Sequence, residues 1–404
     1  MIERVERVQA RMSEEGWQGV VATHPVNVAY LSGFDLQMES LELYAGGHWV
    51  FVVVPSRGVG TLILPVSDVF RLAYEPCLGD LNVVTYGRYN IRTDAKCELS
   101  ELERSVRSMA SRPDPDALIG HAKDAISALV SCLSAYGMES AAIGVDEMGV
   151  SGRFTHELTV SLKDIRIAGA YDTLREVRMT KTSQEVELLR AAVDITERAI
   201  KRVMDSVRPG VSEQDLVREL KLEMTECGAS PSLWYVGAGR ESALIDREPS
   251  DRPVEVGDVI QIDVGCKVSG YFSDLGRTAV LGRPSEKMKT YYGACLEAQQ
   301  AAIGSIRPGA ECSELYREAI NTVRRRGIAH YDRAGCGHGI GMDPYDLPII
   351  GEGCKWKLQE GMVINVEVPY REFGFGGLQI EDTVEVTEDG FRYLSTLDRE
   401  LACL

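Results

Sequence analysis

The sequence predicts two domains: an α/β domain followed by an α+β domain that contains an internal repeat. Three observations support this fold class. The 404 residues exceed one ordinary domain and suit two. Short apolar segments alternate with helical patterns over residues 1–172, which is typical of an α/β fold. Beyond them, a helix–turn–helix pattern occurs twice at a fixed spacing, which indicates two similar halves.

The composition is that of a soluble globular enzyme, with 44% hydrophobic and 26% charged residues. A net charge of −17 argues against a nucleic-acid partner and an anionic membrane surface, because both require a basic protein surface. Residues 1–17 have the pattern of an amphipathic helix without the apolar core of a signal peptide. No segment is apolar enough to span a membrane. The ten cysteines include no C-x-x-C pair, so we expect reduced thiols and a cytoplasmic protein.

Six apolar segments of the first domain predict the strands of a largely covered sheet. They are GVVAT (19–23), HWVFVVVP (48–55), GTLILP (60–65), NVVTYG (82–87), AAIGVDE (141–147) and DIRIAGA (164–170). Helical patterns occupy residues 99–110 and 119–137 between them. The segment GVGTLILP lacks the third glycine and the following helix of a dinucleotide fingerprint, so no nucleotide site is predicted there.

The domain boundary is predicted near residue 172, which gives domains of residues 1–172 and 173–404. Thr182 and Glu185 form a capping box at the start of a long helix, and Pro209-Gly210 ends that helix. The repeat follows: SVRPGVSEQDLVRELKLEMTECG and SIRPGAECSELYREAINTVRRRG have their Arg-Pro-Gly triplets and final glycines 99 residues apart. A site between such halves would draw its ligands from both.

Four acidic residues and one histidine stand in strand-like segments after the two copies of the repeat: Asp263, Asp274, His338, Glu367 and Glu381. Each of them alone would more readily be a surface or ion-paired residue. Together they predict a metal site, because burying several unpaired carboxylates is costly and divalent cations neutralise them. Oxygen ligands with one histidine suit Mn²⁺, Fe²⁺, Co²⁺ or Zn²⁺.

The five residues, with His338 in GHGIG, Glu367 in VEVPY and Glu381 in IEDT, resemble the ligand set of the pita-bread metallohydrolases. This superfamily includes methionine aminopeptidase, aminopeptidase P, prolidase and creatinase. NVAYLSGF (27–34) and LREVRMTKTSQEVELLRAA (174–192) are similar to the aminopeptidase P, prolidase and creatinase branch. The resemblance implies a creatinase-like α/β N-terminal domain, a pita-bread α+β catalytic domain with a pseudo-twofold repeat, and a homodimer.

The resemblance also implies a role for each of the five residues. Asp263 would chelate one metal ion, and His338 with Glu367 would hold the other. Asp274 and Glu381 would bridge the two ions, for which we expect Mn²⁺ ahead of Fe²⁺, Co²⁺ or Zn²⁺. Glu367 would also act as the general base toward a hydroxide shared by the metals.

The sequence departs from the family's peptidases at three accessory histidines, which are replaced here by Asp246, Tyr345 and Ala334. Tyr345 is a candidate catalytic and substrate-binding residue, because a tyrosine donates hydrogen bonds to an oxyanion or acts as an acid. Asp246 would suit a cationic group of the substrate, with a surface turn as the alternative. Trp234 and Tyr235 are implied to lie beside the site as further substrate-binding residues.

The leading interpretation is a dinuclear metal-dependent hydrolase of the Xaa-Pro dipeptidase or aminopeptidase P type, which cleaves a C–N bond in a small peptide or amide. The alternative is a non-peptide enzyme on the same fold, either an amidine or amide hydrolase resembling creatinase or ectoine hydrolase, or a lyase resembling the sulfoniopropionate lyases. The missing histidines favour this alternative, but the complete ligand set argues against creatinase itself, which works without metal. The ligand set also argues against a binding protein resembling the pita-bread domains of histone chaperones, which have lost their ligands.

Overall fold

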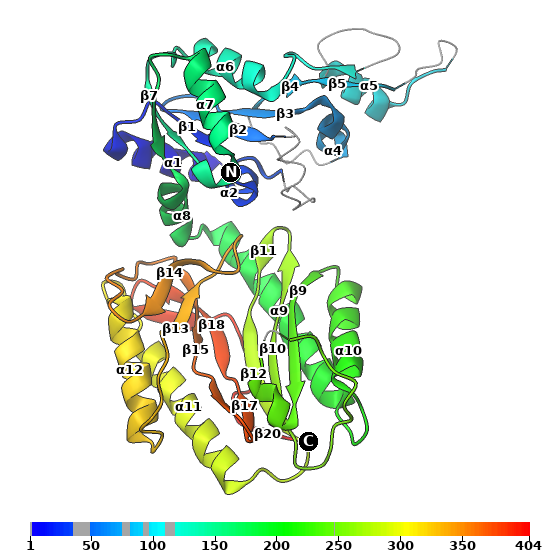
Figure 1. The fold of residues 1–404 in the computed structure, drawn as a ribbon, viewed down its shortest axis with the longest axis vertical. Coiled ribbons are helices and arrows are strands. Elements are labelled where there is room, and N and C mark those ends of the chain that lie inside the picture. Colours follow the sequence, from blue (N-terminus) through cyan, green and yellow to red (C-terminus); the bar gives the residue numbers. More distant parts are fainter. Residues whose placement is uncertain (1, 35–48, 75–80, 92–96, 110–117, 246) are drawn as a thin grey trace. The chain divides into compact units, whose positions relative to one another are not determined.

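A computed structural model describes residues 2–34, 49–74, 81–91, 97–109, 118–245 and 247–404 of the chain. The chain divides into two compact units, Met1–Val177 and Arg178–Leu404, which are drawn in Figure 1. Over these described ranges, we find no helix with the length and apolar character that a membrane crossing requires.

The N-terminal unit is built on a mixed six-stranded sheet, and each strand lies in one of the six predicted segments. In sheet order the strands are β4 (Asn82–Tyr86), β3 (Thr61–Pro65), β2 (Phe51–Pro55), β1 (Gly19–Ala22), β7 (Ala142–Val145) and β8 (Arg166–Gly169). Strand β1 pairs antiparallel with β2 and parallel with β7. Strands β1, β2 and β3 are buried along their whole length, which explains why their sequences are apolar without alternation.

Helices accompany this sheet along the chain, and the last of them continues past Val177, where the first unit ends. They are α1 (Ile2–Glu15), α2 (Pro25–Ser32), α4 (Val69–Tyr74), α5 (Glu101–Met109), α6 (Ala125–Ala135), α7 (Gly152–Ser161) and α8 (Tyr171–Met179). The helix predicted over residues 119–137 begins later than expected, at Ala125. The reason is that Asp124 accepts a hydrogen bond from the Ser127 N–H and caps the helix there, while Leu118–Ile119 form the short strand β6 paired with β5 (Arg88–Tyr89).

The C-terminal unit repeats one arrangement, two helices followed by strands. The first half contains α9 (Ser183–Ser206), α10 (Glu213–Glu226), β9 (Ser230–Ala238), β10 (Val259–Val268), β11 (Tyr271–Phe272) and β12 (Leu275–Val280). The second contains α11 (Glu286–Gly304), α12 (Cys312–Arg325), β13 (Gly335–Gly339), β14 (Asp346–Gly351), β15 (Val363–Glu367), the short hairpin β16 (Tyr370–Glu372) and β17 (Gly376–Leu378), and β18 (Glu381–Thr387). The halves join in one sheet through β12 and β18, at the pair Gly276 and Glu381. Strands β19 (Gly390–Tyr393) and β20 (Ala402–Cys403) pair with β18 and β12.

Local sequence signals set the ends of the repeated helices. The capping box of Thr182 and Glu185 is present at the start of α9, as predicted. Gly228 and Gly327 follow α10 and α12 with φ angles of 79° and 101°. Only glycine adopts such a backbone conformation without strain, so the two repeated glycines act as helix stops.

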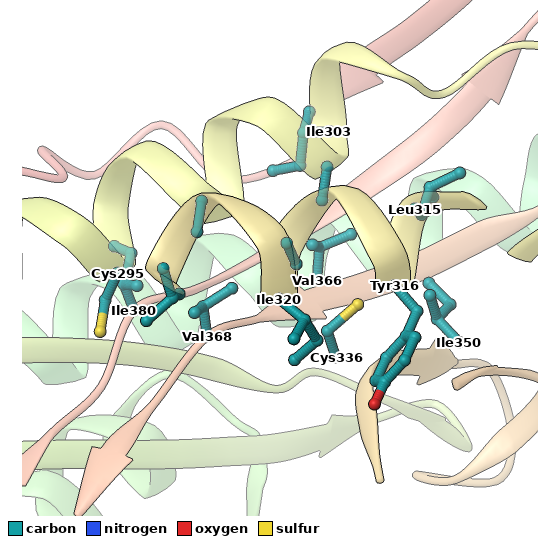
Figure 2. Packing of buried hydrophobic residues seen from close by; sticks show 14 of the residues in the cluster. Cys295, Ile303, Leu315, Tyr316, Ile320, Cys336, Ile350, Val366, Val368 and Ile380 are labelled. Atoms are coloured by element: carbon teal, nitrogen blue, oxygen red, sulfur yellow. The ribbon is translucent and has the colours of Figure 1, made fainter. Parts of the chain in front are cut away.

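Helices α11 and α12 cover one face of the second half of the sheet, and the core of this half lies between them and the strands (Figure 2). Ile303, Leu315 and Ile320 from the helices meet Val366, Val368 and Ile380 from the strands and their neighbouring residues. Because neighbouring strand residues point to opposite faces, Glu367 between the two valines is directed to the other face of the sheet. The same alternation directs Gln379 and Glu381 away from the helices.

Candidate metal centre

The strand register brings the predicted ligands from both halves to one face of the sheet. Glu367 in β15 lies directly opposite Glu381 in β18, and Glu381 in turn pairs with Gly276 in β12. Asp263 in β10 lies opposite the same glycine, and Asp274 immediately precedes β12. His338 in β13 lies opposite Asn365, two residues before Glu367. Residues that are up to 118 positions apart in the sequence therefore lie next to each other.

Three of the predicted ligands form a compact buried cluster. The ligand atoms of Asp274, His338 and Glu381 all lie within 4.8 Å of one another. His338 Nε2 is 3.8 Å from Asp274 Oδ2, while its Nδ1 lies 3.0 Å from the carbonyl oxygen of Gly339. A proton on Nδ1 would be donated to that carbonyl, which leaves the Nε2 lone pair directed at the carboxylates, as a metal ligand requires.

Gln379 links this cluster to the other two carboxylates, and the sequence analysis did not identify it. Its side-chain amide nitrogen donates to Asp263 Oδ2 at 3.0 Å and to Glu381 Oε2 at 3.1 Å, and lies 3.5 Å from Glu367 Oε2. The signal in the sequence was its position two residues before Glu381, because residues i and i+2 of an extended segment share a face.

The electrostatics of the cluster fit a bound cation. Burial, reinforced by the neighbouring carboxylates of Asp263 and Glu367, raises the pKa of Asp274 well above its usual value. Burial and the nearby Asp274 carboxylate likewise raise the pKa of Glu381. Burial lowers the pKa of His338, which keeps the imidazole neutral as a ligand. Asp274 Oδ1 is buried with no hydrogen-bond partner among the described residues. Carboxylate oxygens with one imidazole nitrogen are ligands that divalent ions such as Mn²⁺ or Zn²⁺ bind.

Two arginines that sequence reasoning missed lie beside the two more accessible carboxylates. Arg333 donates to both carboxylate oxygens of Glu367, at 3.1 and 3.3 Å. The Arg371 guanidinium lies 4.0 Å from Asp263 Oδ2. Arg333 directly precedes Ala334, one of the three positions where an accessory histidine is replaced. The Arg333 guanidinium group therefore places a positive charge beside Glu367.

A second set of buried polar residues supports the cluster from behind. Asn365 donates to Glu381 Oε1 at 3.1 Å and to the carbonyl of Asp274 at 3.2 Å. Arg277 donates to the carbonyl of Glu381 and, at 2.7 Å, to Asp382. These contacts fix the backbone and the side chain of Glu381, and such outer contacts orient ligands in metal sites.

Of the predicted substrate-binding residues, Tyr345 lies beside the cluster. The Tyr345 ring lies 4.2 Å from the His338 ring, and the residue is 58% exposed. Partial burial and the carboxylate of Asp274 raise the pKa of Tyr345 above its usual range, which keeps the hydroxyl protonated. Asp246 lies outside the described residues.

Tyr235 and Trp234 cannot both face the cluster, because they are consecutive residues of β9. Tyr235 pairs with Asp263 and shares its face, and its hydroxyl donates to the carbonyls of Ser242 and Leu244 at 2.8 and 3.0 Å. The Trp234 ring instead lies 3.7 Å from Lys221 Nζ of α10. The structure therefore brings Tyr235 to the carboxylate face and directs Trp234 to the other.

The chain matches two family models that together span most of its length. Residues 187–388 match metallopeptidase family M24, and residues 4–180 match the creatinase/prolidase N-terminal domain. Among similar proteins, the Xaa-Pro dipeptidase of Pyrococcus furiosus is 30% identical over 262 residues, which cover 63% of this chain and 75% of that protein.

Solved structures show the same fold over the whole chain. Dipeptidase PepE from Mycobacterium ulcerans superposes with a TM-score of 0.78 at 26% identity and covers 100% of this chain and 97% of its own. A Xaa-Pro dipeptidase from Bacillus anthracis gives a TM-score of 0.80 at 23% identity, with 100% of this chain and 99% of that chain covered. Both confirm the predicted two-domain pita-bread architecture.

The family match and the geometry of the site agree. The family implies divalent metal ions, and the buried carboxylates with one imidazole form a centre that such ions fit. The chain therefore belongs to metallopeptidase family M24 and is a metal-dependent hydrolase with a creatinase/prolidase-type N-terminal domain.

Proposed function

We propose that this protein is a Xaa-Pro dipeptidase, which cleaves the bond before proline in dipeptides. It would bind two divalent metal ions, for which we expect Mn²⁺ ahead of other metals. The observation that carries the proposal is that the five predicted ligands lie on one face of the sheet, with the ligand atoms of three of them within 4.8 Å of one another. The chain is also about 30% identical to proteins described as Xaa-Pro dipeptidases from Pyrococcus furiosus and Pyrococcus horikoshii. A third relative with that description, from Lactobacillus delbrueckii, is 32% identical over 236 residues.

Each ligand has a role that its position supports. Asp263 would bind one ion, His338 and Glu367 the other, and the buried Asp274 and Glu381 would bridge them. Bound divalent ions supply Lewis acidity and lower the pKa of water. Glu367 is the candidate general base, because its side chain is 16% exposed whereas that of Glu381 is buried.

Tyr345 would act on the substrate oxygen rather than as a base. Its raised pKa keeps the hydroxyl protonated at neutral pH, so the residue can donate a hydrogen bond but cannot accept a proton. A hydrogen-bond donor directed at the developing oxyanion stabilises the transition state. Tyr345 thus takes a place that an accessory histidine holds in the peptidases of the family.

The test is hydrolysis of a panel of Xaa-Pro dipeptides and Xaa-Pro-Yaa tripeptides by Mn²⁺-loaded protein, with an EDTA-treated control. We expect metal-dependent release of proline from the dipeptides and little cleavage of the tripeptides. Protein that holds two metal ions per chain and releases no proline from any dipeptide would overturn the proposal.

The second candidate is an enzyme for a small non-peptide amide or amidine, and one observation favours it. All three accessory histidines are replaced, by Asp246, Tyr345 and Ala334. If Asp246 contacts a cationic substrate, Asp246→Asn should raise KM for cationic amides strongly without lowering the melting temperature. An unchanged KM would count against this role.

We also propose that the protein is a cytoplasmic homodimer. The support is the family resemblance and the nine cysteines of the described chain, all of which are free thiols. Light scattering coupled to size-exclusion chromatography tests the stoichiometry, and a mass of one chain at micromolar concentration would contradict it. Fractionation of the source cells tests the location.

A further inference from the structure

The connection between β13 and β14 ends at Tyr345, whose ring lies 4.2 Å from the His338 ring. Tyr345 is exposed, whereas the next residue, Asp346, is fully buried at the start of β14. The backbone at this point therefore connects an exposed side chain near the metal cluster to a buried carboxylate.

Asp346 forms a buried ion pair with Arg178, the first residue of the C-terminal unit. Arg178 Nη2 lies 3.2 Å from Asp346 Oδ1, and Arg178 Nε lies 3.4 Å from Asp346 Oδ2. The two side chains are only 2% and 1% exposed. A guanidinium that contacts both oxygens of a carboxylate fixes its direction as well as its distance.

The same guanidinium also reaches an acidic residue on the other side of Tyr345. Arg178 Nη2 lies 3.9 Å from Asp343 Oδ2, and Asp343 Oδ1 accepts a hydrogen bond from the Tyr345 N–H at 3.3 Å. Asp346 Oδ1 accepts a hydrogen bond from the Leu347 N–H at 3.1 Å. Arg178 thus contacts the aspartates before and after Tyr345, and each aspartate binds a backbone N–H of this turn.

Stability alone is a weak reason for this ion pair, because apolar residues of similar size often replace buried ion pairs without loss of stability. A second basic residue near Asp346 is Lys181, but its Nζ donates to the carbonyl of Met179 at 3.0 Å, and burial lowers its pKa. An arginine side chain stays charged in proteins and offers a planar fork of donors. Arg178 is therefore suited to hold two carboxylates in a fixed arrangement.

We propose that Arg178 is a positioning residue, which holds Asp343 and Asp346 so that the Tyr345 hydroxyl is presented to the substrate beside the metal cluster. The proposal rests on the role of Tyr345 in the proposed function. Because its side chain is buried, Arg178 acts through the turn and not by contact with the substrate. Its loss should therefore lower kcat and leave metal binding unchanged.

A double-mutant cycle tests this role with Mn²⁺-loaded wild type, Arg178→Met, Tyr345→Phe and the double variant, using Ala-Pro as substrate. We expect Arg178→Met to lower kcat by roughly 10- to 100-fold, with a smaller change in KM, because small displacements of a catalytic group cost rate of this order. In the Tyr345→Phe background the same change should lower kcat by less than about threefold, because the hydroxyl that Arg178 positions is already absent. Arg178→Lys should restore part of kcat.

The surface control is Arg392→Met, because Arg392 is 56% exposed on β19, where it pairs with Glu385, and this variant should match the wild type. An unchanged kcat in Arg178→Met, or an equal loss in both backgrounds, would overturn the proposal. So would a loss of Mn²⁺ affinity of about tenfold or more in competition with a chelator, because the effect would then lie on the ligands.

If Arg178→Met does not fold, Asp343→Ala takes its place in the cycle, with the same pattern expected. The Asp343 side chain is 21% exposed, so its truncation leaves no charge buried without a partner except on Arg178, which keeps Asp346. Alanine removes both the contact with Arg178 and the acceptor of the Tyr345 N–H. Equal losses of kcat with and without the Tyr345 hydroxyl would again overturn the proposal.

Hydrogen exchange separates this proposal from the dipeptidase function, because it needs no substrate. Mass spectrometry of a peptide that spans residues 340–349 should show exchange about tenfold faster in Arg178→Met than in the wild type, both loaded with Mn²⁺, since the turn loses its buried anchor. If no dipeptide is cleaved but exchange is faster, Arg178 positions the turn and the dipeptidase function fails. If dipeptides are cleaved while exchange and kcat stay unchanged, the dipeptidase stands and the positioning role is overturned.

Discussion

Glu367 and Glu381 lie directly opposite each other on the antiparallel strands β15 and β18. Two like charges at opposing positions of a sheet destabilise it, and burial makes the repulsion stronger. The strands nevertheless pair without interruption from Val363 to Glu367. Without a cation, the raised pKa of Glu381 relieves this repulsion, because the carboxyl group keeps its proton to higher pH. A divalent cation between the carboxylates would let both ionise, and the first prediction follows from that relationship.

Metal removal should destabilise the protein more at high pH than at low pH. Without a cation, Asp274 and Glu381 keep their protons to higher pH in the folded protein than in the unfolded chain, since their pKa values are raised. Above about pH 4 the folded state then binds more protons, so the free energy of unfolding falls as pH rises through the folded pKa values. Mn²⁺ at 100 times its Kd should raise the melting temperature by roughly 5–10 °C.

The measurement is the melting temperature between pH 5 and 8, with EDTA and with Mn²⁺. We expect the gap between the two curves to widen as pH rises. A gap that is constant or narrows toward pH 8 would show that the pKa values of Asp274 and Glu381 are not raised in the metal-free folded protein.

Glu367→Gln should remove activity and leave the fold intact. The amide keeps the size of the side chain but cannot accept a proton, so we expect kcat to fall by about 10²- to 10⁴-fold. Circular dichroism should be unchanged. The matched control is Glu286→Gln, whose side chain is 88% exposed at the start of α11 and which should retain full activity. A Glu367→Gln enzyme with near wild-type kcat would exclude Glu367 as the base.

Gln379→Leu should weaken metal binding. The variant removes the amide that donates to Asp263 and Glu381, so both carboxylates lose a contact that orients them. Loss of such a contact typically reduces metal affinity by about 10- to 100-fold. Competition with a chelator measures the Kd directly, without an activity assay. Gln214→Leu, on the exposed side of α10, is the control and should bind metal like the wild type.

Tyr345→Phe should slow catalysis without changing the metal content. Phenylalanine preserves the ring beside His338 but removes the hydroxyl, so kcat should fall on the order of 10²-fold. Because the raised pKa of Tyr345 keeps the hydroxyl protonated through neutral pH, the pH profiles of the variant and the wild type should have the same shape between pH 6 and 9. If the activity of the wild type falls at high pH and that of the variant does not, Tyr345 titrates in the active enzyme.

The sequence was most informative where local interactions decide the structure. Apolar segments gave the six strands of the first sheet, and the pair Thr182 and Glu185 gave the start of α9. The repeated Arg-Pro-Gly and glycine positions revealed the two halves. These features depend on residues within a few positions of each other, so their pattern can be read without knowing the rest of the fold.

Strand alternation could have corrected one expectation at the sequence level. Trp234 and Tyr235 are consecutive in β9, so only one of them can share the face of Asp263. The structure brings Tyr235 to that face through its pairing with Asp263, and Trp234 contacts Lys221 of α10. Which of the two faced the carboxylates depended on the register with β10, and a single strand does not specify its register.

By itself, then, the sequence determined the fold class and the set of residues predicted to bind metal, because the residue types and their order carry that chemistry. Only the tertiary structure decided what surrounds the set: the amide of Gln379 among the carboxylates, and Arg333 and Arg371 beside Glu367 and Asp263. Gln379 and Asp263 are separated by 116 positions, and Arg371 and Asp263 lie almost as far apart. Such contacts arise from the pairing of distant strands, which long-range packing selects and no local pattern encodes.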